Sequence, residues 1–187
     1  MILFKAGPNG RKPLALLVVT LALTPIAFGA DDSATLKFPT IKGHGGVFNV
    51  SGKPSLPQKG SKVVVDVTTG AQDGGVNKGL DRAARFVNLF TLGGANDFKM
   101  AVVLHGGATK EALSNKAYMK LFSRPNPNAD LLHQLRQAGV DILVCGQALT
   151  HAGYRPTQTS SDVYVALSAA TAIINRQMKG FAYLPLQ

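Results

Sequence analysis

From residue 62 onward, short aliphatic runs alternate with longer segments in which apolar residues recur at helical spacing. The aliphatic runs cover 63–67, 98–104 and 140–145. Short, uniformly apolar runs of this kind are typical of strands that are buried on both faces of a parallel sheet. The alternation therefore predicts an α/β domain in which helices cover both sides of one sheet.

The segments between and after these runs predict four helices and two further strands. In chain order they are a helix over 78–92, a helix over 111–121, a helix from Asn126 to Gly139, a strand over 163–166, a helix from Ser168 to Met178 and a strand over 181–184. A helix throughout 162–178 fits the pattern nearly as well. With right-handed crossovers, these elements form a three-layer α/β/α fold with a roughly five-stranded, mostly parallel sheet.

Residues 1–29 have the three parts of a secretory signal peptide. Three basic residues precede an apolar run over 14–28, no acid occurs before Asp31, and Ala27 and Gly29 are small residues at the end of the run. An uncleaved anchor is disfavoured, because a run of about 15 residues is shorter than the roughly 20 that span a bilayer. We expect cleavage after Gly29 and a periplasmic or secreted protein with no membrane span.

Cleavage would leave an arm over 30–61 followed by the domain at 62–187. The arm is rich in Gly, Pro, Ser and Lys and has no sustained period, so we expect an extended segment with one hairpin. It would pack on the domain or on a neighbouring subunit. The mature chain carries a net charge of +7, which indicates a solvated basic surface or, second, attraction of anionic ligands or envelope surfaces. Export and the lack of a binding motif argue against a nucleic-acid partner.

Cys145 is the sole cysteine of the chain, which excludes an internal disulfide and a Cys-based zinc ribbon. It ends the third predicted strand, and His105 follows the second. Ligands in open α/β sheets bind beyond the carboxyl ends of the strands, so we expect loops from neighbouring strands to converge on this thiol. Around Cys145 as the candidate catalytic residue, the candidate binding residues are His105, Gly106, Gly107, Gly146, Gln147, Asn77 and His151.

Two interpretations of Cys145 stay open. A reactive thiolate needs a nearby cation, and His105, His151 and Arg155 are the local choices. Alternatively, Cys145 packs in the core as a small hydrophobic residue. His105 likewise either orients Cys145 or binds an anion, or else hydrogen-bonds the glycine turn that follows it. The four histidines show no ligand spacing, so no metal and no other cofactor is expected.

Four segments resemble the DsrE/DsrF-like family of sulfur-relay-related proteins. They are 102–109 (VVLHGGAT), 140–149 (VDILVCGQAL, continuing to Gly153-Tyr154), 165–169 (VALSA) and 177–181 (QMKGF). The resemblance covers nearly all of 62–187. It implies a small α/β fold of the DsrE-like, flavodoxin-like topology class with a five-stranded, mostly parallel sheet, and assembly into homotrimers or hexamers. In sulfur-relay members the cysteine in this position carries a persulfide, and by the motif that residue is Cys145.

The sequence departs from the family pattern in two places. Some relatives have a second cysteine where this chain has Ala148, and the signal peptide separates this chain from cytoplasmic relay partners. The resemblance implies a sulfur carrier or sulfurtransferase-type protein that takes a sulfane-sulfur or small anionic ligand at Cys145, and the leader pattern adds that this member is exported. The alternative is a non-catalytic binding or assembly module with a protein partner, or a structural oligomer with an inert thiol.

Overall fold

The computed structural model describes residues 35–50 and 55–186, so the predicted signal peptide and parts of the arm lie outside the described residues. Its centre is one sheet of five strands in the order β4-β3-β2-β1-β5, all of them parallel. The strands are β1 (Lys62–Val67), β2 (Lys99–Leu104), β3 (Asp141–Cys145), β4 (Tyr164–Ala166) and β5 (Ala182–Leu186). The predicted α/β fold with a parallel five-stranded sheet is confirmed.

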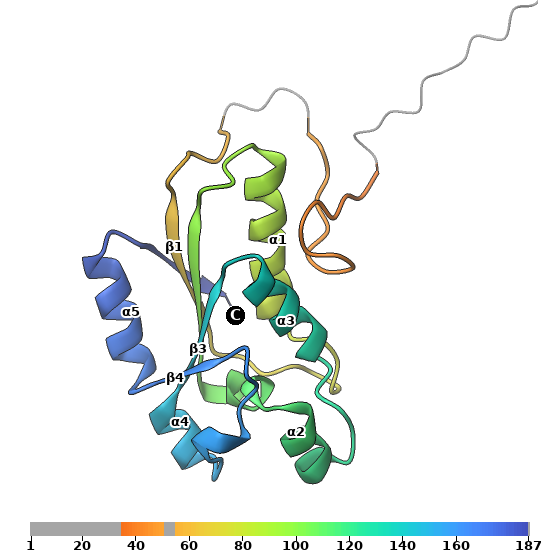
Figure 1. Ribbon diagram of the computed structural model, residues 1–187, viewed down its shortest axis with the longest axis vertical. Helices are drawn as coiled ribbons and strands as arrows, with labels where there is room; N and C mark the ends of the chain where they lie inside the picture. The colour runs from red at the N-terminus through yellow and green to blue at the C-terminus, as the bar shows by residue number, and fades with distance from the viewer. Residues whose placement is uncertain (1–34, 51–54, 187) are drawn as a thin grey trace, which may run out of the picture. The chain divides into compact units, whose positions relative to one another are not determined.

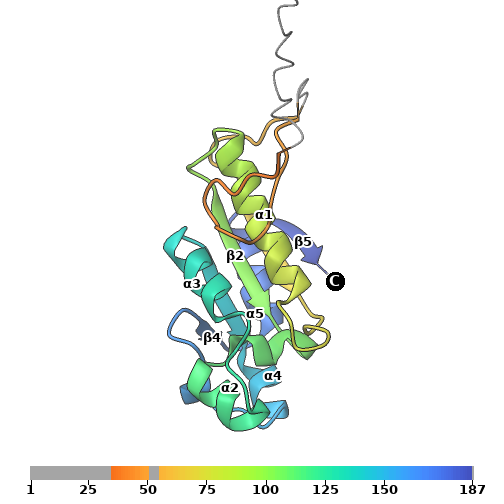
Figure 2. The same ribbon diagram turned by 90° about the vertical axis from the view of Figure 1, so that its right-hand side faces the viewer.

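The helices connect these strands and cover the two faces of the sheet (Figures 1 and 2). They are α1 (Lys78–Leu92), α2 (Asn115–Phe122), α3 (Ala129–Gln137), α4 (Gly146–His151) and α5 (Ala169–Met178), with short 3-10 helices η2 (Gly106–Ala112) and η3 (Pro156–Gln158). Helices α1 and α3 lie on one side of the sheet and α5 lies on the other, which makes three layers.

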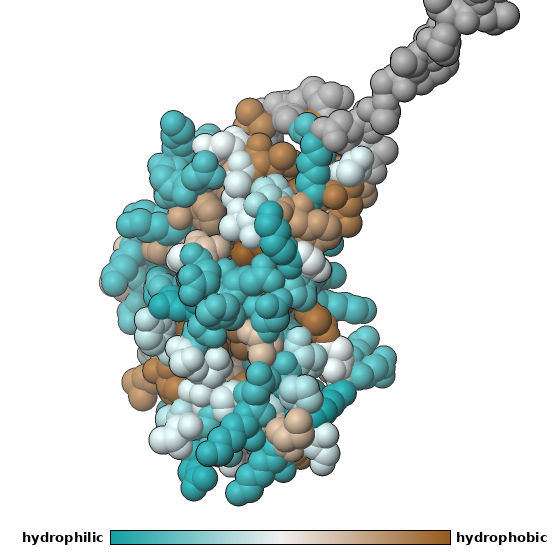
Figure 3. Space-filling model, turned by 45° about the vertical axis from the view of Figure 1, so that its right-hand side comes forward, coloured by the Kyte–Doolittle hydropathy of each residue, from teal (hydrophilic) through white to brown (hydrophobic). Residues whose placement is uncertain are grey.

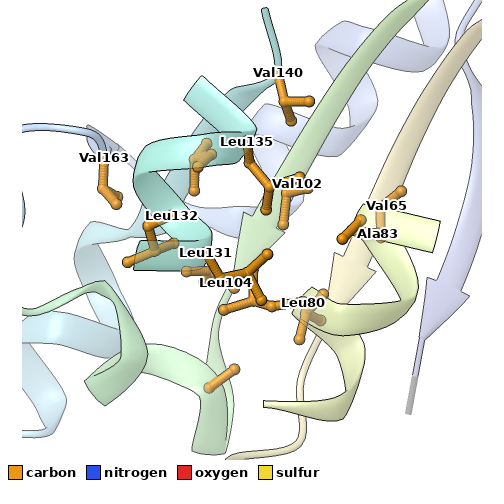
Figure 4. Close-up of a cluster of buried hydrophobic side chains, with 14 of the residues drawn as sticks. Val65, Leu80, Ala83, Val102, Leu104, Leu131, Leu132, Leu135, Val140 and Val163 are labelled. Atoms are coloured by element: carbon orange, nitrogen blue, oxygen red, sulfur yellow. The ribbon is translucent and has the colours of Figure 1, made fainter. Parts of the chain in front are cut away.

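The larger hydrophobic core lies between the sheet and the α1–α3 layer (Figure 4). Val65 and Val102 point from the sheet toward Leu80 of α1 and Leu135 of α3. A smaller core on the opposite face joins β1, β2 and β3 to α5 and consists mainly of small side chains. Every second residue of a strand faces the same layer. The three central strands β1, β2 and β3 supply buried apolar residues to both cores, as strands covered on both faces require, whereas β4 and β5 at the two edges are more exposed.

Two predicted helices differ from the structure. The segment 111–121 is divided, because Leu113 is extended and Ser114 then caps a new helix, α2, by accepting a hydrogen bond from Ala117 N. Helix α3 begins at Ala129 rather than directly after Asn126. The Asn126 side chain binds the carbonyls of Glu111 and Leu113, so it serves the packing of a loop as well as the start of a helix. At the fourth strand, β4 followed by α5 replaces the alternative of a continuous helix.

The described part of the arm is fastened to α1 by one buried side chain. Asn88 of α1 is fully buried, and its amide oxygen accepts from Thr40 N and Ile41 N, both at 2.9 Å. Its amide nitrogen donates to the carbonyls of Ile41, His44 and Gly45 at 3.0–3.2 Å. Lys37 and Val47 exchange two antiparallel backbone hydrogen bonds at 2.8 and 2.9 Å, and Asn88 supplies partners for backbone groups of the loop between them, which lets Ile41 enter the core.

Beyond this fastening, the arm leaves apolar side chains at the surface. Figure 3 shows hydrophilic side chains over much of this face, with hydrophobic ones gathered near its upper end. Leu36, Phe48 and Val50 of the arm and Leu89 of α1 are exposed apolar residues, and they line a hollow of about 350 Å³. An apolar surface of this kind is unusual on a monomer unless something binds it.

We predict that Asn88→Ala lowers the free energy of unfolding by about 3 kcal/mol, because it leaves several buried backbone groups without partners. Urea denaturation followed by circular dichroism measures this loss. Asn96→Ala, at an exposed turn, is the matched control and should change stability by less than about 0.5 kcal/mol. Equal stability of the two variants would contradict the fastening role of Asn88.

Candidate functional site

Cys145 lies at the carboxyl end of β3, at the point where α4 begins. It is the N-cap residue of α4, and its Sγ accepts a hydrogen bond from Ala148 N at 3.4 Å. The residue is 6% exposed, so the thiol is close to the surface but almost covered. The sequence placed Cys145 at this edge of the sheet, and the structure has it there.

The surroundings of Cys145 are small and apolar on the side of α5. It shares a cluster with Val103 of β2 and with Ala169 and Ala172 of α5. Among the described residues, no lysine, arginine or histidine forms an ion pair or hydrogen bond with its sulfur. The thiol is therefore shielded by small apolar side chains, and in the described part of the chain no cation is bonded to it.

His105 directly follows β2, and the register of the sheet places it opposite Cys145 of the neighbouring strand β3. The pairing of β2 with β3 ends at Leu104 and Val144, and His105 continues the extended backbone. One step along each strand brings His105 opposite Cys145, and alternation puts both side chains on the face covered by α5. Adjacent strands are about 4.8 Å apart, so this histidine is the closest titratable neighbour in the register.

The His105 ring is bonded to a carboxylate that the sequence analysis did not single out. Its Nε2 lies 2.7 Å from Oδ1 of Asp66, and the hydroxyl of Tyr183 donates to Oδ2 of the same carboxylate at 2.7 Å. His105 therefore binds a neighbouring strand rather than the glycine turn that follows it. The sequence did offer a signal for Asp66, because it is an acid inside the otherwise aliphatic run of β1. Tyr183 could be recognised as its partner only from the pairing of β5 with β1.

The glycines of the predicted site bring loops together. A Cβ atom on Gly107 would stand 2.9 Å from Gly70 N, so the loop after β2 packs directly on the loop after β1. A Cβ atom on Gly146 would stand 2.8 Å from the carbonyl oxygen of Ala166, so β4 closely approaches the start of α4. Gly106 has a φ of +55°, in the left-handed region that favours glycine.

The other predicted binding residues have different positions. Asn77 caps α1 by accepting from Gly79 N and Leu80 N, and it donates to the Thr69 carbonyl. Gln147 is exposed and donates to the Leu167 carbonyl at 3.3 Å. His151 is exposed at the end of α4. In the described part of the chain, none of the three has a bond to Cys145.

A buried carboxylate holds the loops at this edge of the sheet. Glu111 is fully buried, and its two oxygens accept from Ala71 N and from the Asn128 amide, both at 2.8 Å. Burial raises the pKa of the Glu111 carboxyl above the usual 4.5, although the Ala71 N–H and the charge of Lys110 partly oppose this shift. Proton binding by Glu111 therefore stabilises the fold, fully below about pH 4.5 and progressively less as the pH rises through the raised pKa.

We predict that Glu111→Gln removes part of the pH dependence of stability. Between pH 5 and pH 8, wild type should lose about 1 kcal/mol more than the variant, because only wild type must ionise a buried carboxyl. Urea denaturation at the two pH values measures the difference, with the exposed Asp97→Asn as the control. Parallel losses in wild type and Glu111→Gln would refute the assignment.

The described residues include no group of three histidine, cysteine, aspartate or glutamate side chains that could hold a metal ion. The same ranges contain no helix with the length and apolar character needed to cross a bilayer.

Comparison with known proteins places the domain among small α/β proteins. The model of the DsrE/DsrF-like family matches residues 62–186. The fold is similar to that of the protein of unknown function MTH1491 from Methanobacterium thermoautotrophicum, with a TM-score of 0.50, 17% identity and coverage of 67% of this chain and 99% of that one. It is similar to the ychN protein from E. coli, with a TM-score of 0.50, 15% identity and the same coverages. No curated protein matches the chain.

Proposed function

The chain belongs to the DsrE/DsrF-like family, and from this premise we propose that it is an exported sulfur carrier whose Cys145 bears sulfane sulfur. The observation that carries the proposal is the place of Cys145, at the carboxyl end of a parallel strand with His105 next to it in the register. Export is proposed from the leader pattern at 1–29, and it would place the protein in the periplasm or outside the cell.

The proposed step is a transfer between two sulfur–sulfur bonds. The Cys145 thiolate attacks the outer sulfur of a donor such as thiosulfate, a new S–S bond forms, and the S–S bond of the donor breaks. Sulfite leaves with the electron pair of the broken bond, so no further oxidant is required. The proton of the thiol passes to a base, and His105 is the neighbouring group of suitable chemistry.

The exposure of the residues indicates how a donor would reach the sulfur. Helix α5 covers Cys145 with Ala169 and Ala172, whereas the side chain of His105 is 31% exposed. We therefore propose that the donor approaches over His105. A small anion fits this route better than a bulky disulfide, because the thiol itself is almost covered.

We predict that thiosulfate or polysulfide adds about 32 Da to the peptide that contains Cys145, and that a reducing agent removes this mass. Mass spectrometry of the native protein after incubation measures the addition, and Cys145→Ser is the control that must remain unmodified. An unmodified wild-type thiol under conditions that convert a small free thiol would contradict the carrier function.

A second candidate function follows from the low exposure of Cys145. With the thiol 6% exposed among alanines, the chain would be a binding or assembly module in which this residue only packs. Alkylation separates the two candidates. If iodoacetamide labels Cys145 in the native protein, the thiol is accessible. If it labels only the unfolded protein, the module is favoured.

We also propose that the chain forms a homo-oligomer, a trimer or a hexamer, through the outer surface of α5 and β4. Leu167 is 75% exposed, Met178 is 81% exposed and Ile174 is more than half exposed. Tyr164 and Val165 of β4 add further exposed apolar area. Exposed apolar residues grouped in this way are typical of surfaces that bind another protein chain.

We predict that Met178→Glu lowers the mass of the assembly measured by light scattering, because it places a charge in the proposed subunit interface. Met119→Glu is the matched control, since Met119 is 49% exposed on α2, away from this surface. An unchanged mass in Met178→Glu, or an equal loss in both variants, would refute the proposed interface.

A further inference from the structure

Three side chains from three adjacent strands form a hydrogen-bonded array, and the register places its histidine opposite Cys145. Tyr183 of β5 donates to Asp66 of β1, and the opposite oxygen of Asp66 lies 2.7 Å from His105 Nε2 at the end of β2. The carboxylate is the least exposed of the three: the side chain of Asp66 is 10% exposed, that of His105 is 31% exposed, and Tyr183 is 43% exposed. A nearly buried carboxylate thus has a partner at each oxygen.

The chemistry of these groups fixes the direction of both bonds. An ionised carboxylate only accepts hydrogen bonds, so the tyrosine hydroxyl and the imidazole Nε2–H are the donors. The hydrogen bond to Asp66 raises the pKa of Tyr183, so this hydroxyl keeps its proton at neutral pH. With its proton on Nε2, a neutral His105 ring has Nδ1 as its free acceptor.

The hydrogen-bonded side chains lie on the same face of the sheet as Cys145. Val64, Val103 and Cys145 belong to one apolar cluster. Asp66 and His105 each come two residues after a member of that cluster on the same strand, so alternation puts them on that face too. In the register, His105 stands between β1, which supplies Asp66, and β3, which supplies Cys145.

We propose that Asp66 and Tyr183 are positioning residues for Cys145. They hold His105 by Nε2, so that Nδ1 accepts the Cys145 proton when sulfur is taken up. This inference rests on the proposed carrier function and deepens it. The thiol loses a proton to Nδ1, the thiolate forms the S–S bond to the donor sulfur, and the donor's leaving group departs with the electrons of the broken bond. The imidazolium formed is stabilised by the Asp66 carboxylate.

In the part of the chain that the structure describes, the His105 ring is bonded to Asp66 of β1, whose other oxygen binds Tyr183 of β5. The register places Cys145 of β3 on its other side. The ion pair between α5 and the sheet joins Arg176 to Asp141, which is at the amino end of β3 and so at the opposite edge. Asp66 is therefore the charge that most directly affects the ring.

The first test measures the tautomer of His105 and does not depend on sulfur chemistry. Nitrogen-15 NMR of histidine-labelled protein at pH 8 should find the wild-type ring protonated on Nε2. Asp66→Ala should give a mixture of both tautomers, and Asp66→Asn should keep the Nε2–H form because its amide oxygen still accepts. A wild-type ring protonated on Nδ1, or an unchanged tautomer in Asp66→Ala, would overturn the proposal.

The second test measures the rate of sulfur uptake at two pH values. At pH 7, Asp66→Ala and His105→Gln should be about tenfold slower than wild type, because the base is no longer held in place or is removed. At pH 9.5 they should be within about twofold of wild type, because hydroxide in the solvent can then take the thiol proton in place of the histidine. Asp66→Asn keeps the position of the ring without the charge, so its rate at pH 7 should lie between those of wild type and Asp66→Ala. Tyr183→Phe should lower the rate at pH 7 about threefold.

A matched control separates positioning from folding. Asp162→Asn removes a carboxylate that pairs with His133, so it should not change the rate. If Asp66→Ala is slower by the same factor at both pH values, or is as fast as wild type at pH 7, the positioning role is wrong while the carrier function stands. If wild type takes up no sulfur at either pH, the carrier function itself is wrong.

Discussion

Parallel pairing of all five strands is the constraint on which the rest of this domain depends. Because every strand points the same way, all carboxyl ends lie at one edge, and the loops that follow them must meet there. The β2–β3 register sets His105 beside Cys145, and the β1–β5 pairing sets Tyr183 beside the strand that carries Asp66. Residues up to 117 positions apart are joined in this way.

Buried polar side chains stabilise the parts of the molecule that have no regular hydrogen bonding. Asn88 binds the arm, Glu111 binds the loop after β1, and Asn126 binds the carbonyls that precede α2. Each offers several hydrogen bonds within a low-dielectric interior, where an unpaired group would cost free energy. The arm and the loops that follow β1 and precede α2 are consequently held by side chains that are themselves part of the buried interior.

Local patterns in the sequence were sufficient for most of the fold. The helix over 78–92 was predicted with the bounds that the structure has, because Asn77 and the glycines after Leu92 mark its ends locally. The break at Ser114 was missed, since a serine inside an apolar-periodic segment is compatible with both a helix interior and an N-cap. The position of Cys145 was predictable from its strand. The coverage of Cys145 by α5 and the hydrogen bond between Asp66 and Tyr183 could not be predicted, because both depend on which elements become neighbours in the folded sheet.

The last strand of the sheet has a consequence for the array around Asp66. Strand β5 pairs with β1, the first strand, and it brings Tyr183 to Asp66. Leu186 of the same strand belongs to the larger core. The hydrogen-bonded array is therefore complete only when β5 is paired with β1, so the same strand that closes one edge of the sheet also supplies the last partner of Asp66.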